Sequence, residues 1–106
     1  MKVFNAFSIQ MISSLDEASV SFKKIDVEQA KSLLASDEVD SYVGHIDTAN
    51  VISDLLWMDI PACRRFGTLA PGETALVAQV IGGRLPEGCT TLPEGMAIQF
   101  FQVTVQ

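Results

Sequence analysis

The chain has 106 residues, 48% of them hydrophobic, which leaves room for one domain (residues 1–106) built on one small core. Its formal net charge of −6 argues against binding to duplex DNA, because DNA-binding proteins gain most of their affinity from a basic surface. No run of about 18 apolar residues is present, so we expect no membrane span.

The amino-terminal part of the chain predicts two strands separated by a helical turn. Residues 2–7 alternate weakly between apolar and polar side chains, as a strand does. Ser8 carries a side chain that can cap a helix, and it is expected to begin a short helical turn. Residues 18–24 alternate more regularly and predict a half-buried strand.

A first amphipathic helix is predicted over residues 26–36. Asp26 and Gln29 have the spacing of a capping box, in which each side chain binds the backbone of the other residue. The apolar residues that follow recur at helical spacing, so the helix has one face for the core. Residues 39–43 then predict a short strand.

A second amphipathic helix is predicted in the middle of the chain. It is expected to begin at Asp47 or Thr48, because apolar residues recur at helical spacing after that point. Pro61 is expected to close this unit, since proline cannot continue a helix. Residues 64–69 are interpreted as a further strand.

The carboxyl-terminal third predicts two strands and a long loop. Residues 70–73 have proline and glycine at the positions of a tight turn. Residues 74–81 are strongly β-like and end at two glycines, and residues 97–105 alternate as a final strand. Residues 84–96 hold two prolines and two glycines and predict an ordered or closing loop. The whole pattern predicts one α+β domain, with a mixed β-sheet that carries its helices on one face.

Residues that bind metals are sparse. Cys63 and Cys89 have neither Cys-x-x-Cys nor zinc-ligand spacing, and His45 is the sole histidine, so we expect no metal site and no cofactor. The sequence also begins without the long apolar stretch of a secretory signal. We therefore expect a cytoplasmic protein with two free thiols rather than a disulfide.

His45 is the first candidate for a catalytic residue. It follows a glycine and immediately precedes the second predicted helix. A histidine side chain titrates near neutral pH and can act as a general acid or base. Backbone N–H groups at the start of a helix also favour an anionic substrate group nearby. The alternative is a histidine with a structural role only, and spacing alone does not decide between them.

Arginine side chains supply the second set of candidates. Arg84 and Glu87 lie on a segment that glycines bracket and a proline stiffens. Such a loop can close over a ligand and present a guanidinium group to a phosphate, although a solvated surface pair is the ordinary alternative. Arg64 and Arg65 have the same two interpretations, and if they lie in a strand at most one of them can face a given cleft.

Three polar residues lie within apolar sequence and are candidates for ligand contact or for a purely structural role. These residues are Asn5, Ser8 and Gln79. The glycines of the chain form neither a dinucleotide-binding nor a Walker pattern, and no nucleophile-elbow motif is present. Phosphate-loop enzymes and serine hydrolases of the common types are therefore excluded.

Several motifs, taken in chain order, resemble one small family. They are Asn5-Ala6-Phe7-Ser8, Gly44-His45 followed by Thr48-Ala49, Leu55-Leu56, Ile60-Pro61, Arg64, Pro71-Gly72-Glu73, Gln79, and Arg84-Leu85-Pro86-Glu87-Gly88. With these motifs the chain resembles the viral ring nucleases, the type III anti-CRISPR enzymes of archaeal viruses and mobile elements. It departs from the family pattern at Cys63, where asparagine is common, and at Trp57, where a small residue is common.

The resemblance implies an activity and a set of roles. The activity is metal-independent hydrolysis of cyclic tetra-adenylate, the second messenger of type III CRISPR systems, by a two-fold dimer that binds the ring across its interface beneath a mobile loop. His45 would be the general acid, and Arg84 and Glu87 would lie at the scissile phosphate, with the part played by Glu87 left open. The residues that would line the ring's pocket are Asn5, Ser8, Arg64 and Gln79.

Two other classes of function stay open at the level of sequence. One is a non-enzymatic module that sequesters a nucleotide or a regulatory protein. The other is a nucleic-acid-binding regulator, against which the acidic net charge argues. The residues also do not determine the preferred ring size. Nor do they decide between a role that opposes CRISPR and a role in regulating the host.

Overall fold

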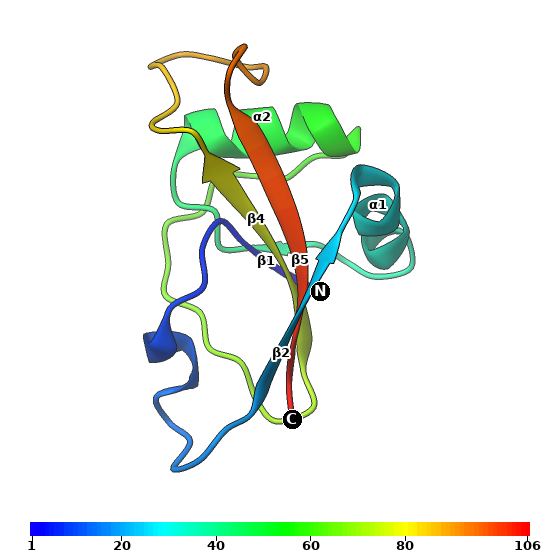
Figure 1. The fold of residues 1–106 in the computed structure, drawn as a ribbon, viewed down its shortest axis with the longest axis vertical. Coiled ribbons are helices and arrows are strands. Elements are labelled where there is room, and N and C mark those ends of the chain that lie inside the picture. The colour runs from blue at the N-terminus through cyan, green and yellow to red at the C-terminus, as the bar shows by residue number, and fades with distance from the viewer.

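Five strands form one mixed sheet in the computed structural model, which describes residues 1–106 (Figure 1). The strands are β1 (Lys2–Phe4), β2 (Val20–Ile25), β3 (Asp40–Ser41), β4 (Thr74–Ile81) and β5 (Ala97–Val105). Their order across the sheet is β2-β5-β4-β1-β3. β1 runs parallel to both of its neighbours, whereas β5 runs antiparallel to β2 and β4. The expected α+β fold with a mixed sheet is confirmed.

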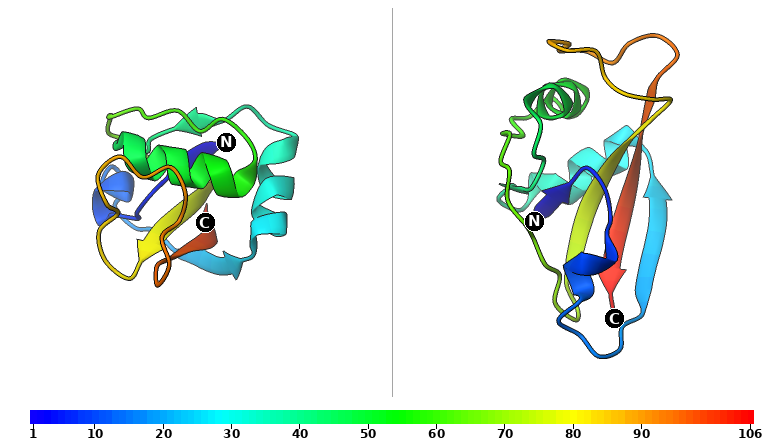
Figure 2. Two further views of the ribbon diagram at one scale, coloured as in Figure 1. Left: turned by 90° about the horizontal axis from the view of Figure 1, so that it is seen from above. Right: turned by 90° about the vertical axis from the view of Figure 1, so that its left-hand side faces the viewer.

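Two helices cover one face of this sheet, as Figure 2 shows. They are α1 (Val27–Ala35) and α2 (Ile46–Leu56). The predicted capping box begins α1: the Gln29 backbone N–H donates to the Asp26 carboxylate over 2.8 Å, and the Asp26 N–H donates to the Gln29 side chain over 3.0 Å. A 3₁₀ turn, η1 (Ile9–Ile12), follows the predicted Ser8 cap.

The strands divide the core into two layers because successive side chains of a strand point to opposite faces. Leu76 and Ala78 of β4 face α1 and α2 and pack with Phe100. Ala75 and Val77, one residue out of phase, face the other side. Met11 of η1 and Leu69 of the connection before β4 cover that second face.

The far end of α2 is tied to α1 and to the chain that follows. Trp57 ends the helix in the left-handed conformation, with φ of 54°, and is the one non-glycine residue with positive φ. The ammonium group of Lys31 on α1 lies 4.2 Å from the centre of the Trp57 ring. The Ser53 hydroxyl donates to the Ala49 carbonyl and accepts from the Ile60 N–H, so it holds the returning chain against the helix.

The prediction of a strand over residues 64–69 is wrong, because this segment has no regular secondary structure. It runs past the outer edge of β3, and its backbone bonds at its end, where the Leu69 N–H donates to the Met11 carbonyl; Cys63, just before it, donates to the Val43 carbonyl. The guanidinium group of Arg65 donates to the Ser41 carbonyl of β3. A strand paired with β3 would need this carbonyl as an acceptor for its own backbone N–H. Local alternation of residues cannot reveal that this edge is already occupied.

Other predicted boundaries are off by a few residues. β1 ends at Phe4 rather than at residue 7, and β3 is limited to two residues. α2 begins at Ile46, before the expected Asp47 or Thr48, because His45 itself caps the helix.

Gly67 lies where a side chain would not fit. A Cβ atom added there would lie 2.6 Å from Tyr42 and 2.8 Å from Phe4, whose rings are stacked. Replacing Gly67 with alanine is therefore expected to destabilise the fold by about 1–3 kcal/mol, since the stacked pair has to shift. Urea unfolding measures this change.

Gly44→Ala is the matched control for that substitution. Its new Cβ would lie an ordinary 3.8 Å from Arg64, and its φ is not positive. This variant is expected to keep the stability or gain up to about 1 kcal/mol. Equal free energies of unfolding for the two alanine variants would contradict the packing argument.

Candidate functional site

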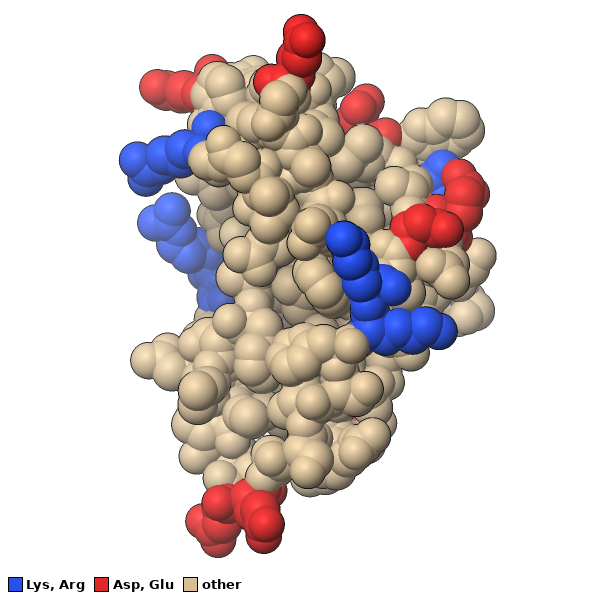
Figure 3. Space-filling view, in the orientation of Figure 1, with Lys and Arg blue, Asp and Glu red and all other residues tan.

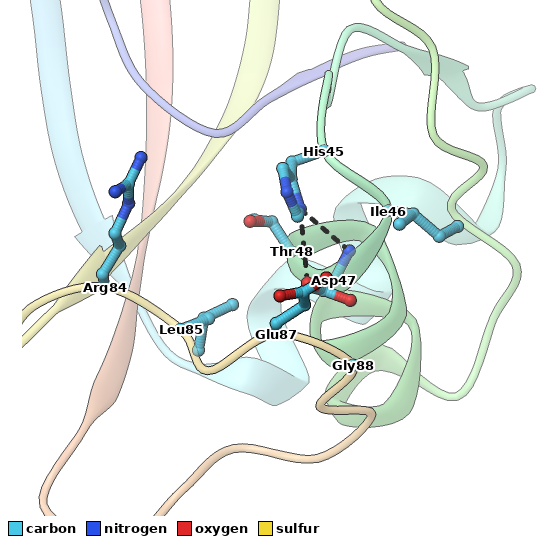
Figure 4. Close-up of a pocket in the computed structure, with 8 residues that line it drawn as sticks. All are labelled: His45, Ile46, Asp47, Thr48, Arg84, Leu85, Glu87 and Gly88. Atoms are coloured by element: carbon cyan, nitrogen blue, oxygen red, sulfur yellow. Dashed lines mark hydrogen bonds and ion pairs between the residues drawn. The ribbon is translucent and has the colours of Figure 1, made fainter.

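The largest cavity of the molecule, about 780 Å³, lies between the start of α2 and the loop that joins β4 to β5 (Figure 4). Two segments far apart in the sequence meet there. The lining residues are His45, Ile46, Asp47 and Thr48 from the first turn of α2, and Arg84, Leu85, Glu87 and Gly88 from the loop. The structure thus brings the three predicted catalytic residues, His45, Arg84 and Glu87, to one cavity.

His45 caps the start of α2, which is the end of the helix that lines the cavity. It is the N-cap residue of the helix, and its Nδ1 atom accepts a hydrogen bond from the Asp47 backbone N–H over 3.2 Å. Histidine is not among the residues that ordinarily cap helices, which are serine, threonine, aspartate and asparagine. With Nδ1 accepting, the proton of the neutral ring is assigned to Nε2, which is left free for a ligand.

The two faces of this first turn differ in exposure. The His45 side chain is 60% exposed, whereas the Asp47 side chain is 9% exposed, and the Nδ1 and Oδ2 atoms lie 3.7 Å apart. Figure 4 shows the two groups facing each other. The imidazole is therefore reachable from solvent and has one carboxylate beside it.

The loop that carries Arg84 is shaped by glycines at its root. Gly82 has φ of 103°, and a Cβ atom there would come within 3.0 Å of the Gly95 carbonyl oxygen. Only glycine allows the two ends of the loop to approach this closely. The tip is closed by a backbone hydrogen bond from Cys89 to Pro86, and Gly88 between them also has positive φ.

A smaller cavity of about 240 Å³ adjoins the first and shares Thr48, Arg84 and Leu85 with it. Asn5 and Gln79 line this second cavity. Asn5 directly follows β1, and Gln79 lies near the end of β4, which runs parallel to β1. The carboxyl ends of neighbouring parallel strands meet at one edge of a sheet, and this edge is a common place for ligands.

Two of the predicted pocket residues line neither cavity. The Ser8 hydroxyl accepts the N–H of Gln10 and caps η1. Arg64 is exposed and lies beside Gly44, the residue before His45, with no ion pair of its own. The structure places both of them outside the two cavities of this single chain.

The neighbouring arginine, Arg65, has a structural role. Its guanidinium group pairs with the Asp40 carboxylate and lies 4.1 Å from the centre of the Tyr42 ring. The hydrogen bond to Asp40 raises the pKa of Arg65 further above its ordinary value. Arg64 is therefore the arginine of this pair that is free for a ligand.

The charges of the molecule are divided between regions of its surface. In Figure 3 most acidic side chains lie towards the two ends of the molecule, while basic side chains project at mid-height and along the left edge. Arg84 and Glu87 are both exposed and are not joined by an ion pair. Figure 4 shows the Arg84 side chain extending away from the loop and away from Glu87. The solvated-pair interpretation of these two residues therefore has no contact to support it.

Sequence reasoning missed part of the lining. Asp47 was expected only as a helix start, and Ile46, Thr48 and Leu85 were not singled out for the cavity. The available signal for Asp47 was its position two residues after a histidine at a helix entrance.

No group of three or more histidine, cysteine, aspartate or glutamate residues has a geometry that could hold a metal ion. No helix has both the length and the apolar character that crossing a bilayer requires.

Comparisons with known proteins identify similar chains. The model of the STIV B116-like family matches residues 1–102. Among solved structures, B116 of Sulfolobus turreted icosahedral virus superposes with a TM-score of 0.77, at 24% sequence identity and over 97% of each chain. At that identity the likeness shows a shared fold. No curated protein sequence matches the chain.

Proposed function

The chain belongs to the STIV B116-like family, and from that premise we propose that it is a ring nuclease that cleaves cyclic tetra-adenylate and so switches off type III CRISPR signalling. The observation that carries the proposal is the meeting of His45, Arg84 and Glu87 at one cavity. His45 and Arg84 are 39 residues apart in the sequence. The site of action is the cytoplasm of the host of a virus or mobile element. The family resemblance noted above supplies the substrate.

The residues at the cavity suit cleavage of a phosphodiester by the ribose next to it. In this reaction the 2′-hydroxyl gives up its proton to solvent as its oxygen attacks the adjacent phosphorus in line, and the bond from phosphorus to the 5′-oxygen breaks. The products are a 2′,3′-cyclic phosphate and a 5′-hydroxyl group. The protein has to hold the in-line geometry, neutralise charge on the phosphorus and protonate the leaving oxygen.

Each of these tasks has a candidate residue at the cavity. The Nε2 atom of His45 is free to donate a proton to the leaving oxygen, because Nδ1 faces Asp47. The Arg84 guanidinium group, exposed and unpaired, can offset the charge of the phosphorane. Asn5 and Gln79 line the adjoining cavity and can bind the part of the ring next to the scissile phosphate.

A two-fold dimer suits a ring with four equivalent units. Each protomer would supply one His45 and one Arg84, so two opposite phosphodiesters of the ring would meet identical groups. Ser8 and Arg64, which lie outside the cavities of one chain, would reach the ring where two protomers meet.

The proposal is tested by incubating the protein with cyclic tetra-adenylate in EDTA. We expect linear di-adenylate products that end in a cyclic phosphate, because no step above uses a metal ion. Chromatography against synthetic standards identifies the products, and rings of other sizes serve as the comparison. An unchanged ring after long incubation with folded protein would reject the assignment, and tight binding without turnover would favour a sequestering module.

A further inference from the structure

Asp47 is a carboxylate whose position the fold alone does not explain. Its side chain is nine-tenths buried, and its carboxylate accepts no hydrogen bond from the protein, while its oxygen atoms keep contact with solvent. The one ionic partner of its carboxylate is the His45 ring, at 3.7 Å from Nδ1 to Oδ2. Carboxylate side chains in the first turn of a helix are commonly exposed, but this one is mostly buried and has a single histidine partner.

The start of α2 by itself opposes a charged His45. Helix amino termini carry partial positive charge from their free N–H groups, and this charge disfavours a cation. The Asp47 N–H, which donates to Nδ1, also stabilises the neutral ring specifically. A histidine that has to carry a proton to a leaving oxygen needs a group nearby that favours its charged form.

Asp47 offers the ring a partner in each of its two states. The backbone N–H of Asp47 donates to Nδ1 when the ring is neutral. After protonation Nδ1 carries hydrogen and needs an acceptor, and the Asp47 carboxylate lies on the same side of the ring. The Nδ1 atom thus lies near a donor and an acceptor of the same residue, at 3.2 Å from the backbone nitrogen and 3.7 Å from Oδ2.

We infer that Asp47 is the positioning residue of His45: its carboxylate holds the protonated imidazole in place for donation from Nε2 to the leaving 5′-oxygen. This inference rests on the proposed ring nuclease function. It also leaves Glu87, the other carboxylate at the cavity, free for a role at the substrate.

Other charged groups face His45 from the neighbouring elements. Arg84 and Glu87 of the β4–β5 loop line the same cavity, and Arg64 lies beside Gly44, the residue before His45. None of them forms an ion pair with the imidazole. The Asp47 carboxylate is therefore the charge whose removal should affect the ring most directly.

The test is the Asp47→Asn variant, which keeps the size of the side chain and removes its charge. Because His45 is the sole histidine, its Hε1 proton gives one NMR resonance that needs no assignment. We expect the pH at which this resonance is half-shifted to be lower than in wild type, because the variant lacks the carboxylate beside Nδ1. At pH values above that midpoint, kcat for ring cleavage should fall by about 3–10-fold, with KM unchanged.

Asp54→Asn is the matched control, because it removes one negative charge from an exposed position of the same helix. It should leave the midpoint and kcat unchanged. If Asp47→Asn does not fold, Asp47→Ser is used, since serine is well tolerated in a first helical turn and also lacks the charge. A folded Asp47 variant with the wild-type midpoint overturns the inference. If the midpoint falls but wild-type protein does not cleave the ring, the pairing of Asp47 with His45 stands and the proposed function fails.

Discussion

Replacement of His45 with asparagine is expected to lower the rate of cyclic tetra-adenylate cleavage by about 10²–10⁴-fold, the range typical of a lost general acid. Asparagine cannot protonate a leaving oxygen at neutral pH. Binding of the ring should persist, because Arg84 and the residues of the adjoining cavity are unchanged. Single-turnover cleavage and equilibrium binding of a labelled ring measure the two quantities separately.

The choice of asparagine follows from the cap that His45 provides. His45 begins α2 by accepting the Asp47 N–H, and asparagine is a preferred residue at the same position. His45→Ala would remove the cap as well, at a cost of about 0.5–2 kcal/mol in stability. We therefore expect both variants to lose activity and only the alanine variant to lose stability. Full activity in the asparagine variant would show that the imidazole donates no proton in the reaction.

Replacement of Arg84 with glutamine is the substitution with the next largest expected effect. The guanidinium group is exposed at the cavity and has no ion pair inside the protein, so its removal should cost little stability. If it offsets charge on the phosphorane, the loss should lower kcat by about 10²–10³-fold. The ring should also bind less tightly, because one of the few cations near the cavity is gone.

Lys24→Gln is the control for the change in net charge. Lys24 is exposed on β2, an outer strand of the sheet, and lines no cavity. It should leave cleavage unchanged at moderate salt, where long-range attraction is screened. If both glutamine variants lose the same factor, Arg84 acts through the general field of the protein and not at the phosphate.

The sequence predicts those parts of the fold whose signals are local. The capping box at Asp26 and the strands 74–81 and 97–105 have the expected bounds, because each is set by neighbours in the chain. The strand prediction for residues 64–69 is wrong because strand pairing depends on an edge that is distant in the sequence. At that edge the Arg65 guanidinium group binds the Ser41 carbonyl. The order of strands across the sheet has no local signal at all.

The candidate site shows the same division. His45 and Arg84 could be singled out from their local settings, a helix entrance and a glycine-bounded loop, and the fold brings them together. That Ser8 and Arg64 lie outside the cavities is a property of the folded chain, which spacing does not encode. The burial of Asp47 against His45 likewise depends on how α2 packs on the sheet.

The base of the β4–β5 loop lies near Arg84 in the chain, whereas the middle of the loop lies farther from it. The two ends of the loop approach closely where Gly82 meets the Gly95 carbonyl group, and Arg84 lies two residues beyond that point. Residues 90–92 lie between the turns closed by Cys89 and by Met96 and make no backbone hydrogen bond, so a change in their number is expected to leave Arg84 in place. Insertions or deletions at residues 90–92 are therefore expected to leave the lining of the large cavity intact, because that lining ends at Gly88.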